Sequence, residues 1–232
     1  MYSFLKSQTS LKRILWSKYT LSVAISNRLL GCPTGILLFR DPETRFLSYF
    51  HDKFRKAPRK MLAENRLHPK ELQHCQRLWL NSVGVSTHDM VACCQALLET
   101  PLEAVLSWLP EHYRQDPHTR PQLDCLYAQR HWIKLSLNIS RVFLIENPAE
   151  MQLFGQLLEI DTSRKVHQTQ DKQREHTLGK TGRAMLRQIY PLDFELYQQI
   201  RHTSLRKRSS VLQSLLRTNR KNTVADLWDE SI

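Results

Sequence analysis

Two short stretches of the sequence are apolar and are bounded by turn residues. The first covers residues 35–39 (Gly-Ile-Leu-Leu-Phe), and the second covers residues 140–146, with an apolar centre at 142–145. Continuous apolar runs of this length are typical of strands that are buried on both faces of a parallel sheet. The pattern therefore predicts two central strands.

A helix is expected directly after the first strand. Asp41 can cap it, Pro42 suits its first position, and Phe46, Phe50 and Phe54 then recur every four residues. This spacing places the three rings on one side of a helix. Strand, tight turn and helix together form a βα unit.

Helical spacing also dominates the rest of the chain. We expect helices at 11–30, at 87–98, from a Thr100–Glu103 capping box through Trp108, and from Pro148 through Leu158. Beyond a polar stretch at 161–182, one helix should end near Tyr190 and another should begin at Asp193. Strands alternating with helices predict one α/β domain over residues 1–232, with a small parallel sheet flanked by many helices.

The composition adds a strong positive charge to this picture. Lys and Arg number 34 against 22 Asp and Glu, which gives a formal net charge of +12. Such a surplus favours polyanionic partners, including nucleotides, sulfated glycans, nucleic acids and anionic lipids. No signal peptide or membrane-spanning stretch is recognisable, so the chain as written is expected to be soluble and cytoplasmic.

The cysteines are odd in number and contain no C-x-x-C pair, which argues against a zinc site or a fully paired disulfide framework. We therefore expect no metal, and we interpret the cysteines mostly as buried thiols without a catalytic role. They are Cys32, Cys75, Cys93, Cys94 and Cys125.

The segment 39–50 is the most informative one chemically. Arg40 follows the first strand and precedes a predicted helix N-terminus, where both the guanidinium and the free N–H groups attract anions. Ser48 lies about two turns along that helix and offers a hydroxyl away from the phenylalanine stripe. The two side chains suit a phosphate group, although Arg40 could instead be paired with a neighbouring carboxylate.

The Arg-Asp-Pro motif, followed by Arg45, Ser48 and Tyr49, resembles the 3′-phosphate-binding motif of sulfotransferases. Three later segments are similar, in the same order, to segments of the Golgi carbohydrate sulfotransferase family. They are Asp-Pro-His-Thr-Arg-Pro-Gln at 116–122, the strand ending in Glu-Asn at 142–147, and Tyr-Pro-Leu-Asp-Phe-Glu-Leu-Tyr at 190–197. The resemblance covers residues 36–200 and implies a P-loop-NTPase-like sulfotransferase fold.

The resemblance also implies the ligands. The donor would be 3′-phosphoadenosine 5′-phosphosulfate, with Arg40 and Ser48 on its 3′-phosphate, and the acceptor would be a carbohydrate hydroxyl. Four further residues are candidates for contact with the substrate: His118, Arg120, Gln122 and Glu146. A structural histidine and a structural ion pair of Glu146 are the alternatives, and Tyr190 with 193–195 is expected to pack and cap helices.

One departure from the family leaves the activity open. The family opens with a loop similar to Pro-Lys-x-Gly-Ser/Thr around the 5′-phosphosulfate, and nothing in residues 1–39 matches it. Gly179-Lys180-Thr181 resembles the end of a P-loop, but it lacks the first glycine and a preceding strand. The chain is therefore either a truncated sulfotransferase, whose full form would reside in the Golgi lumen or membrane, or an inactive relative.

Several alternatives remain open at this stage. The general base is unassigned, because no histidine precedes His51. The basic stretch 201–222 could hold an anionic glycan or be a solvated helix. A second basic group could contact phosphate or form a solvated face; it consists of Arg55, Lys56, Arg59 and Lys60. An inactive protein that binds a 3′-phosphonucleotide or anionic glycan is the second functional hypothesis. A nucleic-acid-binding protein is the third, although no motif of that class is present.

Overall fold

The computed structural model describes residues 35–116, 118–123, 127–130, 133–136, 139–158 and 177–218. The helix predicted at 11–30, together with Cys32 and Cys125, lies outside these residues. The chain divides into two compact units. The first contains residues up to Asp41, 122–167 and the segment from Leu192, and the second contains 42–121 and 168–191.

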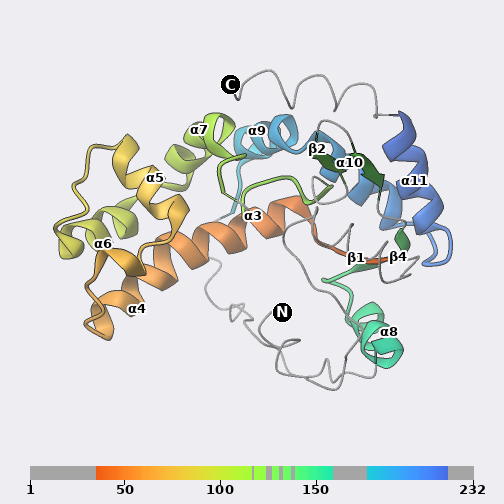
Figure 1. Cartoon of the computed structure of the whole chain (residues 1–232), viewed down its shortest axis with the longest axis horizontal. Helices are drawn as coiled ribbons and strands as arrows, with labels where there is room; N and C mark the ends of the chain where they lie inside the picture. The colour runs from red at the N-terminus through yellow and green to blue at the C-terminus, as the bar shows by residue number, and fades with distance from the viewer. Residues whose placement is uncertain are drawn as a thin grey trace. The chain divides into compact units, whose positions relative to one another are not determined.

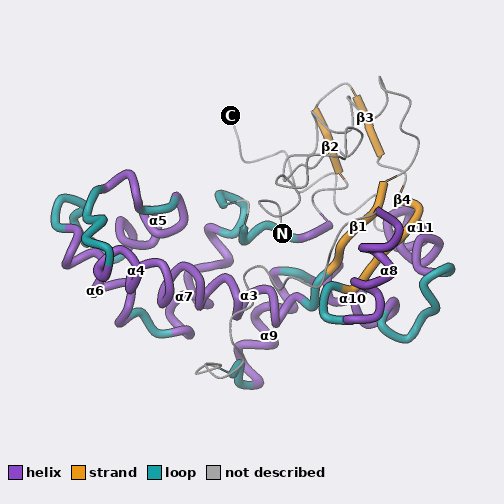
Figure 2. The backbone as a smooth tube through the Cα atoms, turned by 90° about the horizontal axis from the view of Figure 1, so that it is seen from below, coloured by secondary structure: helices purple, strands orange, loops and turns teal. Residues whose placement is uncertain are grey.

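The first unit is built on a two-stranded parallel sheet, in which strands far apart in sequence lie side by side (Figures 1 and 2). In its register, Leu37 lies opposite Val142 and Phe39 opposite Leu144. The predicted parallel sheet is confirmed, although the second strand ends two residues earlier than expected. The elements of this unit are β1 (Gly35–Phe39), β2 (Tyr127–Arg130), β3 (Ile133–Ser136), β4 (Ile139–Leu144), α8 (Pro148–Leu158), α10 (Pro191–Ile200) and α11 (Arg208–Thr218).

The antiparallel pair β2 and β3 was not predicted. Its sequences, Tyr-Ala-Gln-Arg and Ile-Lys-Leu-Ser, are too short and too polar to form an apolar run. These strands therefore form because two short neighbouring segments pair with each other, and a hydrophobic pattern in the sequence does not reveal them.

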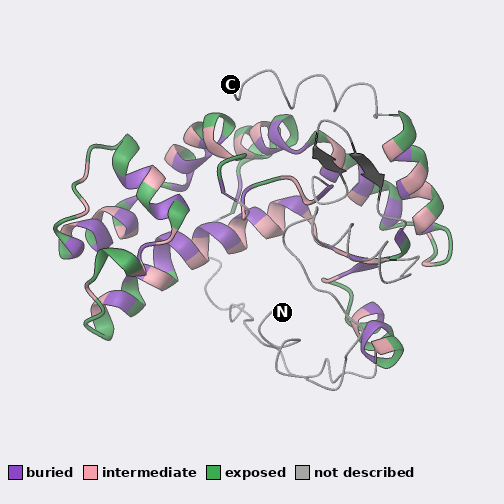
Figure 3. Ribbon diagram, in the orientation of Figure 1, coloured by how far each residue is buried: buried purple, intermediate pink, exposed green. Residues whose placement is uncertain are grey.

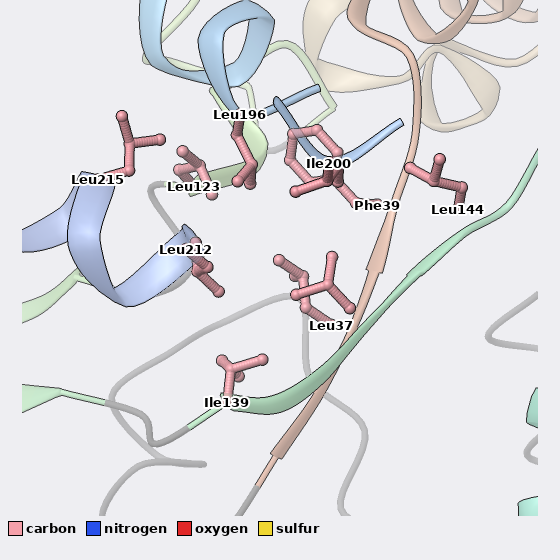
Figure 4. Close-up of a cluster of buried hydrophobic side chains, with 10 residues drawn as sticks. Leu37, Phe39, Leu123, Ile139, Leu144, Leu196, Ile200, Leu212 and Leu215 are labelled. Atoms are coloured by element: carbon pink, nitrogen blue, oxygen red, sulfur yellow. The ribbon is translucent and has the colours of Figure 1, made fainter. Parts of the chain in front are cut away.

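Helices cover both faces of the parallel sheet. On one face Leu37, Phe39 and Leu144 pack with side chains from α10 and α11, and Figure 4 shows them converging. On the other face Phe143 packs against Phe154 of α8. Burial on both sides explains why both strands read as apolar runs in the sequence.

The second unit is helical. Its elements are α3 (Pro42–His51), the π-helix η1 (Asp52–Lys56), α4 (Ala57–Ala63), η2 (Pro69–Glu71), α5 (His74–Ser82), α6 (Met90–Glu99), α7 (Leu102–His112) and α9 (Lys180–Ile189). The predicted stripe is confirmed, since Phe46, Phe50 and Phe54 are all buried. Phe54 lies in η1, where its ring stacks on Phe50 and meets Trp79 edge-on.

The capping box predicted at 100–103 is wrong. The hydroxyl of Thr100 donates to the carbonyl of Ala96 and accepts from the indole nitrogen of Trp79, so it serves the helix before and not the helix after. Pro101 is the N-cap of α7 and supplies no side-chain hydrogen bond. The buried Trp79 N–H requires an acceptor, and this tertiary demand overrides the local capping pattern.

Two further predictions at helix ends need correction. The polar stretch expected to reach residue 182 ends earlier, because α9 begins at Lys180. Asp193 is not an N-cap, since α10 begins at Pro191 and Asp193 is fully buried in its first turn. Phe194, expected in the core, is only half-buried, whereas Leu196 is fully buried.

The expectation that Arg55 lies on a basic surface is also wrong. Its guanidinium is buried, lies over the ring of Phe50, and donates to the carbonyls of Leu97 and Thr100. It also donates to the carbonyl of Phe54, which Pro58 cannot serve because proline has no N–H. Lys56, Arg59 and Lys60 are exposed, as expected for a solvated face.

Among the described residues, no single helix has the length and apolar composition needed to cross a bilayer. Helices α6 and α7 reach that length and composition only as a pair, and they are bent by 103° at the break between them.

A buried ion pair joins α11 to β4 and α8. Arg208 begins α11, which is otherwise exposed on one side and buried on the other (Figure 3). Its terminal nitrogens lie 2.6 and 2.8 Å from the two carboxylate oxygens of Glu150. Glu150 also accepts from the backbone N–H of Leu144, at 2.7 Å. Arg208 is therefore buried in an ion pair, and it belongs neither to a solvated basic helix nor to a surface that could hold a glycan.

Removal of Arg208 should destabilise the protein strongly. We expect Arg208→Met to lower the free energy of unfolding by about 3 kcal/mol, because it leaves the buried Glu150 carboxylate without its cation. Arg206→Met, which changes an exposed arginine two residues earlier, should cost about 0.5 kcal/mol or less. Urea denaturation of both variants measures the difference, and equal effects would contradict a structural role for the pair.

Candidate functional site

Arg40 lies directly after β1, at the edge of the sheet where the carboxyl ends of both parallel strands meet. Its Nε lies 3.2 Å from Oε1 of Glu146, a residue that follows β4. The same oxygen accepts from the backbone N–H of Asp41 at 3.2 Å. The two side chains are 33% and 29% exposed, so the pair is open to solvent on one side.

Gln122 holds the backbone of Arg40. Its Oε1 accepts from the Arg40 N–H at 3.0 Å, and its Nε2 donates to the Arg40 carbonyl at 2.7 Å. Gln122 is held in turn by Asp193, whose carboxylate accepts from the N–H groups of Gln122 at 2.6 Å and Leu123 at 3.1 Å. Gln122 and Glu146, from two separate segments, thus contact Arg40, and Asp193 from a third segment holds Gln122.

The electrostatics of this cluster leave the arginine able to bind an anion. Glu146 contacts Arg40 through Nε, and no other hydrogen bond of its guanidinium is formed within the described parts of the chain. Burial raises the pKa of Glu146, and the nearby charge of Arg40 opposes that shift. The terminal nitrogens of an arginine form a planar fork that matches two oxygens of a phosphate or sulfate.

The segment after β4 is itself fixed by hydrogen bonds. The side-chain oxygen of Asn147 accepts from the N–H groups of Ala149 and Glu150, and its amide nitrogen donates to Glu150. The Glu-Asn motif therefore has two roles: Glu146 contacts the arginine, and Asn147 begins α8.

A second polar cluster lies within the second unit. Nδ1 of His118 is 2.9 Å from Oδ1 of Asp116, and the His118 N–H donates to the same oxygen at 2.7 Å. Arg45 of α3 donates to the carbonyls of His118 and Arg120. It also lies over the ring of Tyr190, 5.9 Å from the ring centre.

The candidate site residues thus fall into two groups that make different contacts. Gln122 and Glu146 contact Arg40, whereas His118 and Arg120 belong to the turn that Arg45 holds. Arg120 is exposed, and its Nε donates to the carbonyl of Arg114. Ser48 lies on α3 and is half-buried.

Tyr190 has the packing role that the sequence suggested. It is buried, and its hydroxyl donates to the carbonyl of Thr119. The role of Asp193 was missed, because an aspartate that follows a proline break resembles a helix cap. A buried carboxylate on two distant N–H groups has no signal in the local sequence.

The Gly-Lys-Thr segment is a helix start. Gly179 is the N-cap of α9. The residues described directly before this helix, 177–179, form no strand. A side-chain carbon at Gly182 would come within 2.9 Å of Leu178 and 3.0 Å of Leu106, so this glycine allows close helix packing. These features suit a structural helix.

The three described cysteines are buried free thiols. Burial raises the pKa of Cys75 to about 12 and also raises the pKa of Cys93 and of Cys94. The thiolate is the nucleophilic form of cysteine, so burial disfavours the reactive form at all three positions.

Comparison with known proteins decides the family. A model of the Sulfotransferase family matches residues 6–198, which is most of the chain. The chain belongs to the sulfotransferase family. No curated protein and no solved structure was found to match it.

This result confirms the family predicted from the Arg-Asp-Pro motif and the three later segments. The small parallel sheet with its many helices agrees with the α/β fold of a sulfotransferase. Family membership supports transfer of a sulfuryl group as the general activity of the protein.

The Asp116 carboxylate should make stability depend on pH. Burial acts to raise its pKa, but hydrogen bonds from the side chain and N–H of His118 outweigh burial and lower the pKa from 3.8 to about 2. A depressed pKa stabilises the folded state above the unfolded value, and the gain is lost as pH falls from about 5 towards 2.

We therefore expect Asp116→Asn to lower the free energy of unfolding by about 2 kcal/mol at pH 7, with the difference shrinking below pH 4. Denaturation series at pH 7, 4 and 3 measure it. Glu111→Gln, at an exposed position, should behave like the unchanged protein at each pH. A difference for Asp116→Asn that persists undiminished at pH 3 would rule out this origin.

Proposed function

We propose that the protein transfers a sulfuryl group from 3′-phosphoadenosine 5′-phosphosulfate to a hydroxyl of a carbohydrate. The observation that carries the proposal is Arg40, placed at the carboxyl edge of the parallel sheet with Glu146 on its Nε. Ligands of open α/β sheets bind outside the carboxyl ends of the strands, where this guanidinium lies.

In this proposal Arg40 and Ser48 both bind the 3′-phosphate of the donor. The assignment comes from the Arg-Asp-Pro motif and from the position of Ser48 in it. Arg40 supports the assignment because Glu146 contacts only its Nε, and Ser48 supports it because this residue of α3 is only half-buried. A guanidinium and a neutral hydroxyl are both suitable donors to a phosphate.

The reaction itself requires no metal in its balance. An acceptor hydroxyl attacks sulfur, the bond from sulfur to the 5′-phosphate oxygen breaks, and adenosine 3′,5′-bisphosphate leaves with the bonding electrons. The hydroxyl proton passes to a general base, which we have not assigned to any of the described residues. Cationic groups stabilise the charge that develops on the leaving phosphate.

The carbohydrate acceptor follows from the three segments that resemble Golgi carbohydrate sulfotransferases. We propose His118 and Arg120 as contacts for the acceptor, whereas Gln122 and Glu146 are engaged with Arg40. The net charge of +12 is consistent with an acidic glycan as acceptor.

A second candidate function is binding without transfer. It rests on the same part-exposed guanidinium of Arg40, which can bind an anion whether or not a sulfuryl group is transferred. A protein of this kind would bind the 3′-phosphate of the nucleotide, or an anionic glycan, and would leave the donor intact.

Nucleotide binding tests the donor assignment. Adenosine 3′,5′-bisphosphate at about 100 times its Kd should stabilise the protein by about 2.7 kcal/mol, which corresponds to roughly 5–10 °C in Tm. Adenosine 5′-monophosphate and ATP at the same concentration should have little effect. Arg40→Ala or Ser48→Ala should remove the shift, as followed by differential scanning fluorimetry.

Matched controls are available for both residues. Arg217→Ala changes an exposed arginine of α11, and Ser107→Ala changes an exposed serine of α7, so both should keep the full shift. Equal shifts with any polyanion would instead favour the nucleic-acid-binding hypothesis. Release of adenosine 3′,5′-bisphosphate from the donor in the presence of glycans then separates a transferase from a silent binder.

A further inference from the structure

We infer that Gln122 and Asp193 are positioning residues that hold Arg40 in the orientation needed for the 3′-phosphate of the donor. This inference rests on the proposed function, because it assigns a purpose to residues around the proposed phosphate ligand. It replaces the contact with substrate expected for Gln122 and the helix cap expected for Asp193.

The first step is the bond pattern of Gln122. One primary amide contacts both peptide groups of Arg40, accepting from its N–H at 3.0 Å and donating to its carbonyl at 2.7 Å. Only asparagine and glutamine carry a primary amide, which donates through its nitrogen and accepts through its oxygen. The amide thus binds both backbone groups of the residue that follows β1.

The second step is the attachment of Gln122 itself. Asp193 is fully buried in α10, and its two carboxylate oxygens accept from the consecutive N–H groups of Gln122 and Leu123 at 2.6 and 3.1 Å. Hydrogen bonds to a charged group are stronger than neutral ones. The segment that carries Gln122 is therefore fastened to α10, 70 residues away.

The third step concerns the guanidinium. Gln122 fixes the backbone of Arg40, and Glu146 fixes the side chain through Nε. An arginine side chain loses roughly 2 kcal/mol of conformational entropy when it is ordered. Most of that loss has already occurred before the ligand binds, so the entropic cost of binding the phosphate is smaller.

The network could also serve only to hold the unit together, and one measurement separates the two roles. A structural defect lowers affinity for all nucleotides alike. A displaced Arg40 lowers affinity only for nucleotides that carry a 3′-phosphate. The informative quantity is therefore the ratio of Kd for adenosine 5′-monophosphate to Kd for adenosine 3′,5′-bisphosphate.

The experiment compares this ratio in Gln122→Met and the unchanged protein by isothermal titration calorimetry. Methionine keeps the length of the side chain, but it has no N–H to donate to the Arg40 carbonyl and its sulfur is only a weak acceptor. We expect the ratio to fall about tenfold, with Tm changed by only a few degrees. Gln122→Glu, which loses the donor to the Arg40 carbonyl, should change the ratio in the same direction.

Two reference variants complete the design. Gln199→Met alters an exposed glutamine of α10 whose amide donates to Glu195, and it should leave the ratio unchanged. Arg40→Ala gives the ratio when the guanidinium is absent. Asp193→Asn keeps the shape of the buried carboxyl group and should lower the ratio together with Tm.

The outcomes separate the inference from the proposed function. If Arg40→Ala leaves the ratio unchanged, the donor assignment itself is wrong. If Arg40→Ala lowers the ratio while Gln122→Met and Gln122→Glu preserve it, only the positioning role is wrong. Equal loss of affinity for both nucleotides, or failure of both Gln122 variants to fold, would show that Gln122 is structural.

Discussion

The parallel pairing of β1 with β4 is the constraint on which the proposed site depends. Phe39 lies opposite Leu144, so the residues that follow the two strands, Arg40 and Glu146, become neighbours although 106 positions separate them. The pairing is stabilised by apolar side chains on both faces of the sheet. Burial of these strands is therefore what brings a cation and a carboxylate to one edge.

The arginines of this protein are used in different ways, and the difference carries the functional argument. Arg208 is buried and bound to both oxygens of Glu150, and Arg55 is buried among backbone carbonyls. Both guanidinium groups are thus bound to buried protein groups. Arg40 is one-third exposed and contacts its carboxylate through Nε, which suits an arginine that receives a ligand.

The segments that resembled the carbohydrate sulfotransferases have physical roles that the resemblance did not contain. The Pro-Gln pair supplies the amide that holds the backbone of Arg40. The Glu-Asn pair supplies one residue to Arg40 and one to the start of α8. Asp193, in the last segment, fastens the Pro-Gln segment. These motifs therefore act together on one arginine.

Local sequence patterns were sufficient to predict the two central strands, the phenylalanine stripe of α3 and the sulfotransferase family. Apolar runs, four-residue spacing and the Arg-Asp-Pro motif each lie within a short segment of the chain. The folded structure was needed to show that Thr100 accepts from Trp79, that Arg55 and Arg208 are buried, and that Asp193 binds Gln122. In each of these cases a polar group chooses its partner from a segment distant in sequence. Burial leaves such a group no water to bind, and the sequence does not record which distant segment will be adjacent.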